Sequence, residues 1–205
     1  MKIEPIIDFL KETEKFKTCE RTCHTTNPKR PESDAEHSWH LCLFLVLLEK
    51  ELGDIDFLKL IKIALVHDLP EIYAGDTNPY RGDVQNKARK EKASADKLFS
   101  RLPDQLGKEM RALFEEYAQQ ETPEAKIVKS ADKLLPLIQN LCTNEAYSSY
   151  RMLNVTHEEV VDYMDPFFSS EDILSLFYRK LLHDSDSNGV FYTPGDKDVT
   201  SSGTY

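Results

Sequence analysis

The sequence lacks long apolar segments and an excess of positive charge, and each absence excludes a broad class of protein. Its longest fully apolar run covers residues 41–48, far short of the ~18 residues that a membrane-spanning helix needs. Lys and Arg number 26 against 36 Asp and Glu, a formal net charge of -10. Because binding to a phosphate backbone needs a basic surface, we expect no nucleic-acid polymer as partner. A small anionic substrate is compatible, since a metal ion and one or two arginines can reverse the field locally.

Features of a secreted protein are also missing. The chain has four cysteines: Cys19, Cys23, Cys42 and Cys142. They form no disulfide pattern typical of secreted domains, which favours a reducing, cytoplasmic location. The N-terminal segment contains Glu4 and Asp8 and does not resemble a signal peptide.

Hydrophobic periodicity predicts an all-α fold. Apolar and charged residues recur at helical spacing, and no segment alternates with the two-residue period of a strand. Ser33 with Glu36, and Thr156 with Glu159, form capping boxes that mark the starts of two helices. Pro123 is placed to begin a third, long helix.

Composition suggests how the chain is divided. At 205 residues we expect one helical domain at 1–183 and a flexible or loosely docked tail at 184–205, where Asp, Ser, Gly and Thr dominate. Residues 19–31 are polar, contain two prolines and are expected to be irregular. Residues 87–97, rich in Lys, Arg and Glu, are expected to form a solvated helix face.

Three predicted helices carry a polar side chain on their apolar face. His37 lies on such a face in the helix that follows the first capping box, His67 on that of the next helix, and Asp132 on that of the long helix. A buried carboxylate needs a cation or strong hydrogen bonds, because removing an isolated charge from water is costly. Asp68 adds a second carboxylate beside His67. Two histidines and two carboxylates suit a divalent metal, so we predict that these four residues converge on one ion.

Each residue also has a structural alternative. His37 could be a hydrogen-bonded core histidine, and Asp132 could pair with a neighbouring lysine. His67 could interact with the C-terminus of its own helix, an effect worth ~0.3–1 kcal/mol. Three such coincidences would leave the His67–Asp68 doublet unexplained, so a shared metal site is the better interpretation.

Three motifs in this order resemble the HD-domain superfamily of metal-dependent phosphohydrolases. They are RPESDAEHSWH at 30–40, ALVHDLPEIYAGD at 64–76 and AKIVKSADKL at 125–134, and the order His, His-Asp, Asp is the signature of that superfamily. The RPES sequence, Glu71 and the Gly75-Asp76 pair resemble its small single-domain branch of 5'-deoxynucleotidases. The resemblance covers about residues 7–147 and implies an all-α, single HD-domain helical bundle.

The resemblance also implies roles for the matching residues. One divalent cation, with Co, Mn, Zn, Mg, Fe and Ni not distinguished, would be bound by His37, His67, Asp68 and Asp132. Glu71 would orient or deprotonate the attacking water, and Asp76 would contact the sugar of the nucleotide. Arg21 would hold the phosphate, with Arg30 as a second candidate. The branch has a tryptophan after this arginine, whereas Thr22 follows Arg21 here, which leaves the sugar and base preference open.

The expected function is metal-dependent removal of the 5'-phosphate from a (deoxy)nucleoside monophosphate by activated water. No nucleophile with a paired base is apparent, which favours direct hydrolysis. Two alternatives stay open: an HD-type deoxynucleoside triphosphate triphosphohydrolase, and a non-catalytic metal- or nucleotide-binding module. A guanosine tetraphosphate hydrolase fits less well, because Ile72 follows Glu71 where that group has an aspartate. Since close relatives of the branch are often homodimers, we expect a homodimer.

Overall fold

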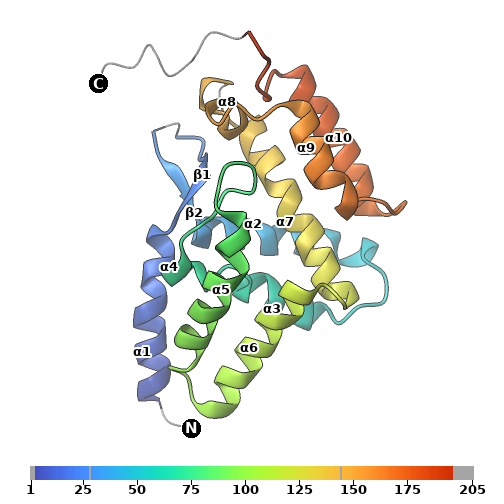
Figure 1. Cartoon of the computed structure of the whole chain (residues 1–205). Helices are drawn as coiled ribbons and strands as arrows, with labels where there is room; N and C mark the ends of the chain where they lie inside the picture. Colours follow the sequence, from blue (N-terminus) through green and yellow to red (C-terminus); the bar gives the residue numbers. More distant parts are fainter. Residues whose placement is uncertain (1–2, 28, 144, 196–205) are drawn as a thin grey trace. The chain divides into compact units, whose positions relative to one another are not determined.

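The computed structural model describes residues 3–27, 29–143 and 145–195 and divides the chain into two compact units. Unit 1 comprises Met1–Arg21 and Ser33–Ala131, and unit 2 comprises Thr22–Glu32 and Asp132–Tyr205. Helices make up most of both units (Figure 1), which confirms the all-α fold class. One of the boundaries between the units falls inside one long helix, after Ala131. The expected single domain over residues 1–183 stays a prediction.

Unit 1 contains the helices that precede this long helix, together with the first part of the long helix itself. They are α1 (Glu4–Thr13), η1 (Glu14–Thr18), α2 (Asp34–Leu48), η2 (Glu49–Glu51), α3 (Phe57–Val66), α4 (Glu71–Ala74), α5 (Val84–Phe99), α6 (Asp104–Gln119) and the start of α7 (Pro123–Leu141). Contacts between α2 and α3, α3 and α6, and α5 and α6 enclose the core. The fully buried side chains there include Leu41, Leu60, Ile63 and Leu98.

Capping residues set the helix starts as predicted. Ser33 Oγ accepts a hydrogen bond from Glu36 N at 3.3 Å, and Glu36 Oε2 accepts one from Ser33 N at 2.9 Å. Thr156 and Glu159 form the same reciprocal pair at the start of α9 (His157–Met164). Both predicted capping boxes are therefore confirmed, and the first one fixes where α2 begins relative to His37.

The connection between α3 and α4 brings three polar residues close together. His67 is the residue at which α3 ends, and Glu71 N donates to Asp68 O at 2.9 Å to start the next turn. Pro70 has no N–H to continue the α3 ladder. Gly75 has φ +74° and ends α4, a conformation that glycine adopts without a steric penalty. The tight connection thus holds His67, Asp68 and Glu71 within one short segment.

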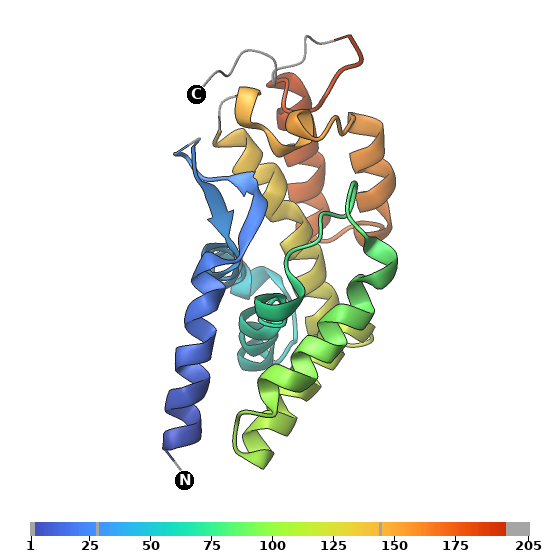
Figure 2. The ribbon, with the colours of Figure 1, turned by 60° about the vertical axis from the view of Figure 1, so that its left-hand side comes forward.

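Unit 2 contains the rest of α7 and the elements that follow it (Figure 2). They are η3 (Glu145–Tyr147), α8 (Ser149–Met152), α9, η4 (Asp165–Phe167) and α10 (Ile173–Ser187). Tyr178 of α10 donates to Asp165 Oδ1 at 2.7 Å, and its ring stacks on Phe168 with centroids 4.5 Å apart. These contacts attach α10 to the segment that ends α9.

A two-stranded sheet corrects one expectation of the sequence analysis. Residues 19–31 were expected to be irregular, but β1 (Glu20–His24) pairs with β2 (Pro31–Ser33). Thr25 N donates to Arg30 O at 3.1 Å and closes the turn between the strands. Strands this short contain too few residues for a two-residue alternation to stand out.

Part of the predicted tail is ordered within unit 2. Helix α10 continues to Ser187, and both Val190 and Phe191 are buried. Ser148 Oγ donates to Val190 O at 2.6 Å, which anchors this segment. The predicted flexibility of residues 196–205 lies outside the described residues.

None of the helices among the described residues could span a bilayer, because each is too short or too polar.

Candidate functional site

The carboxylate of Asp68 is the point on which the polar side chains of unit 1 converge. Its Oδ2 atom lies 3.1 Å from His67 Nε2 and 3.9 Å from His37 Nε2. Both imidazole rings are buried, and their centroids are 5.7 Å apart. The structure thus brings together three of the four predicted metal ligands inside one unit.

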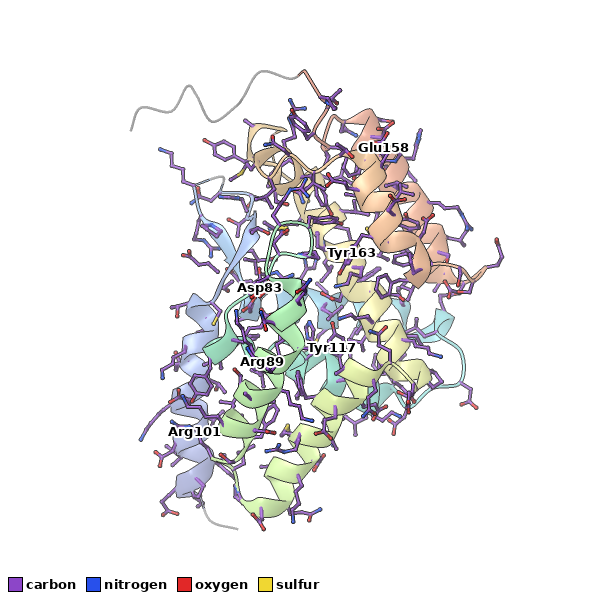
Figure 3. The ribbon with its side chains drawn as sticks, in the orientation of Figure 1. Asp83, Arg89, Arg101, Tyr117, Glu158 and Tyr163 are labelled. Carbon is purple, nitrogen blue, oxygen red and sulfur yellow. The ribbon has the colours of Figure 1, made fainter. Side chains whose placement is uncertain are left out.

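A hydrogen bond to the backbone sets the orientation of His67. Its Nδ1 atom lies 2.8 Å from Ala64 O. Because a carbonyl oxygen can only accept, Nδ1 carries a proton, and Nε2 is the ring nitrogen that faces Asp68. Tyr117 of α6, labelled in Figure 3, packs against the ring with centroids 5.0 Å apart. A histidine held through Nδ1 by a carbonyl, with Nε2 facing a carboxylate, fits a divalent cation.

Two further buried carboxylates lie beside Asp68. Asp34, Asp68 and Glu71 each place an oxygen within 4.8 Å of the others, and Asp34 and Glu71 are almost completely buried. Burial and, to a smaller extent, the charge of Asp68 raise the pKa of Asp34 to about 7, although Arg21 acts in the opposite direction. Burial also raises the pKa of Glu71, with Asp68 adding to the effect. Negative charge on this group is therefore costly where water is excluded, so the group favours a bound proton or cation.

Two cations balance this carboxylate group. Arg21 Nη1 lies 3.1 Å from Asp68 Oδ2 and 3.3 Å from Asp34 Oδ1. Lys87 Nζ lies 3.2 Å from Glu71 Oε1. Arg21 therefore lies beside Asp34 and Asp68, and its role as a phosphate ligand stays a prediction. Lys87 contradicts the expectation of a solvated face, because the packing of α5 against α4 directs it towards Glu71.

Sequence reasoning missed Asp34 and Lys87 for different reasons. Asp34 occupies the first turn of α2, where an acidic residue is ordinarily explained by the helix dipole. Lys87 belongs to a run of charged residues in which nothing marks one lysine from the next. The place of Asp34 inside the first capping box, three residues before His37, was a usable signal, whereas no sequence signal identified Lys87.

The remaining predicted residues lie in different places. Asp76 follows Gly75 at the end of α4, is partly buried, and its charge contributes to the raised pKa of Asp34 and of Glu71. Arg30 belongs to unit 2 and is exposed, and its Nη1 donates to Pro31 O at 3.3 Å. Arg21 is thus the candidate phosphate ligand that lies in the same unit as the histidines.

Asp132 begins the part of α7 that belongs to unit 2, one residue after Ala131, the last residue of unit 1. Its side chain is buried, and Lys133 Nζ lies 3.0 Å from its Oδ2. Lys133 also lies above the ring of Tyr163, labelled in Figure 3, at 5.6 Å from its centroid. Lys133 is therefore the neighbouring lysine whose pairing with Asp132 the sequence analysis gave as a structural alternative. One ammonium group on Oδ2 is compatible with a second cation on the other oxygen, because an ionised carboxylate has about four acceptor positions.

These observations define a class of protein. A model of the family described as "HD domain" matches residues 13–172 of the chain. The chain therefore belongs to the HD domain family, which confirms the resemblance seen in its three motifs.

The chain is also similar to individual known proteins and to solved structures. The chain is 38% identical over 114 residues to "5'-deoxynucleotidase HDDC2" of Xenopus laevis, a match that covers 55% of this chain and 56% of that protein. It is 33% identical over 141 residues to the protein of the same name from Dictyostelium discoideum, with coverages of 65% and 74%. Among solved structures, a "Predicted metal-dependent phosphohydrolase" from Magnetospirillum magnetotacticum MS-1 matches with a TM-score of 0.83 and 30% identity, over 93% of this chain and 98% of that one. The chain thus spans little more than half the length of the Xenopus relative.

The raised pKa of Asp34 predicts a specific pH dependence of stability. Because the folded-state pKa is about 7 and the ordinary value is 3.8, the protonated form favours folding, and this stabilisation is lost as the pH rises through about 7. Asparagine mimics the protonated acid. Asp34→Asn should therefore flatten the fall in unfolding temperature between about pH 4 and pH 7, measured by circular dichroism with a chelator present. Asp54→Asn, at an exposed position, is the control. If the unfolding temperature of Asp34→Asn depended on pH as that of the wild type does, the raised pKa of Asp34 would be contradicted.

Proposed function

We propose that this HD-domain protein is a metal-dependent phosphohydrolase that removes the 5'-phosphate from a deoxynucleoside monophosphate by direct attack of water. The observation that carries the proposal is the convergence of His37 Nε2 and His67 Nε2 on the carboxylate of Asp68. The names of its relatives support the details: the HDDC2 proteins are called 5'-deoxynucleotidases, and the Magnetospirillum protein is called metal-dependent.

The proposed metal ligands are His37, His67, Asp68 and Asp132. Support for Asp132 comes from its burial and from its place in a helix that runs without interruption from Ala131 of unit 1. This donor set does not distinguish among Co, Mn, Zn, Mg, Fe and Ni. When bound, a divalent cation polarises the phosphoryl group and makes water a stronger nucleophile.

The other proposed site residues bind the substrate or accept a proton. Glu71, buried three residues after Asp68, accepts the proton of the attacking water. Arg21 binds phosphate oxygens, because its planar guanidinium is anchored at Nη1 by two carboxylates and matches phosphate geometry. Asp76 contacts the sugar hydroxyl, and Arg30 is the second candidate for phosphate.

We also propose that the chain forms a homodimer. The outer face of α2 exposes Trp39, Leu43, Val46 and Leu47, and Leu47 is 73% exposed. A helix that is apolar on both its inner and its outer face is typical of buried helices, so the outer face fits a second copy of the chain. Sedimentation equilibrium measures this, and a monomer at all concentrations would contradict it.

The proposed activity is tested with a panel of nucleoside monophosphates and triphosphates, with divalent metals added or removed by a chelator. We expect inorganic phosphate from deoxynucleoside monophosphates, lost on chelation and restored by metal. Release of triphosphate from deoxynucleoside triphosphates would instead support the triphosphohydrolase alternative. Metal binding without turnover of any nucleotide would support the non-catalytic module.

Asp132→Asn tests the fourth ligand. Asparagine keeps the shape of the side chain but removes the charge that offsets the cation, so metal content and turnover should both fall while the circular dichroism spectrum stays that of a folded protein. Metal content is measured by elemental analysis after dialysis. Asp162→Asn, at an exposed position on α9, should retain both properties. Wild-type metal content and turnover in Asp132→Asn would exclude Asp132 as a ligand.

Glu71→Gln separates chemistry from binding. Glutamine keeps the size of the side chain but removes its basicity, so kcat should fall on the order of 10²–10⁴-fold. Metal content should stay near wild type and KM should change little, because Glu71 is not proposed to bind either group. By contrast, Asp76→Ala should mainly raise KM and weaken discrimination between sugars. A metal-loaded Glu71→Gln enzyme with wild-type kcat would show that Glu71 is not the base.

A further inference from the structure

Lys87 is the one lysine of α5 whose ammonium group reaches a buried carboxylate among the described residues. Its Nζ atom lies 3.2 Å from Glu71 Oε1 of α4 and 3.2 Å from Glu91 Oε1, one turn further along α5. The side chain is about one-third exposed. Asp83 and Arg89, labelled in Figure 3, lie on either side of it along the chain. The ammonium group is thus held between a carboxylate of its own helix and a carboxylate of the candidate site.

Lys90 provides an internal comparison on the same helix. Its Nζ atom lies 3.6 Å from Asp83 Oδ2, and both side chains are about half exposed. Surface pairs of this kind contribute ~0–1 kcal/mol, because water and salt screen them. Lys87 differs because its partner Glu71 is 2% exposed, so little water competes for that carboxylate.

The two carboxylate oxygens of Glu71 have different surroundings. Oε1 accepts from Lys87, whereas Oε2 is buried and has no hydrogen-bond partner among the described residues. Glu71 belongs to a helix of a single turn, α4, and its carboxylate lies close to those of Asp34 and Asp68. Repulsion from these neighbours would rotate or displace an unrestrained carboxylate. The contact with Lys87 opposes that displacement.

A purely structural role for this pair is the weaker explanation. Burying one charged partner is costly, and a buried ion pair often stabilises a protein no more than a hydrophobic pair of similar volume. A requirement for stability alone would therefore not favour a lysine at this position. A requirement for one defined orientation of the Glu71 carboxylate would favour a lysine at this position.

We propose that Lys87 is a positioning residue for the hydrolytic reaction: it holds Glu71 through Oε1 and so leaves Oε2 to accept the proton of the attacking water. The inference rests on the proposed function, because it assumes that Glu71 is the base. Among the described residues, the ion pairs of Lys87 are with Glu71 and Glu91, so its proposed effect passes through Glu71. Glu91 restrains the ammonium group from the opposite side, so Glu91→Gln should give a smaller effect in the same direction.

The test compares three variants of the full-length, metal-loaded protein. Lys87→Met removes the charge and keeps the length of the side chain, and it should lower kcat on the order of 10- to 100-fold, as the loss of a residue that orients a site does. KM should stay within about twofold, since substrate binding is not altered, and metal content should be unchanged. Lys87→Arg keeps the charge and should recover much of the lost kcat. Lys90→Met is the matched control and should resemble wild type.

A double-mutant cycle with Glu71→Gln separates positioning from stability. If Lys87 acts only through the Glu71 carboxylate, Lys87→Met should lower kcat no further in the Glu71→Gln background. An equal loss in both backgrounds, or wild-type kcat in Lys87→Met, would overturn the inference. Should Lys87→Met fail to fold, Lys87→Gln replaces it, and failure of both to fold would assign Lys87 to stability and also overturn the inference. Wild-type kcat in Glu71→Gln alone marks the distinct case in which the proposed base is wrong.

Discussion

The repulsion among three buried carboxylates is the constraint on which the rest of unit 1 depends. Asp34, Asp68 and Glu71 lie within 4.8 Å of one another at the oxygen atoms, and such a group is stable only where cations or protons offset it. The protein supplies Arg21 to two of the carboxylates and Lys87 to the third. The same negative charge suits the group to a divalent cation.

Local geometry turns this charge into a directed site. The α3–α4 connection contributes a histidine and two carboxylates from one short segment, and Ala64 O fixes the tautomer of His67. Helix α2 adds His37 from the other side of Asp68. His37 lies within α2, whereas His67 and Asp68 lie in the short turn between α3 and α4. His67 faces Asp68, whereas Glu71 faces Lys87, so the proposed binding and proton-transfer roles belong to side chains with different partners.

Much of this arrangement could be predicted from the sequence, and the predictions that failed did so for identifiable reasons. The capping boxes located α2 and α9, and the motif order located the histidines and Asp68. The strands β1 and β2 were missed because they are too short for a period to be recognised. The sequence ranked Arg21 ahead of Arg30 as a phosphate ligand only through the family resemblance, since both follow the first helix in polar sequence. Only the structure shows that Arg21 binds Asp34 and Asp68.

The sequence by itself determined the helical class, the helix starts and the residue types of a metal-dependent phosphohydrolase, because periodicity, capping and motif spacing are local properties of the chain. Tertiary structure decided which charges meet. Periodicity assigns a side chain to a helix face but does not say which element covers that face. Lys87 and Lys90 therefore look alike in the sequence, yet the packing of α5 on α4 places only Lys87 on buried Glu71 and leaves Lys90 with exposed Asp83.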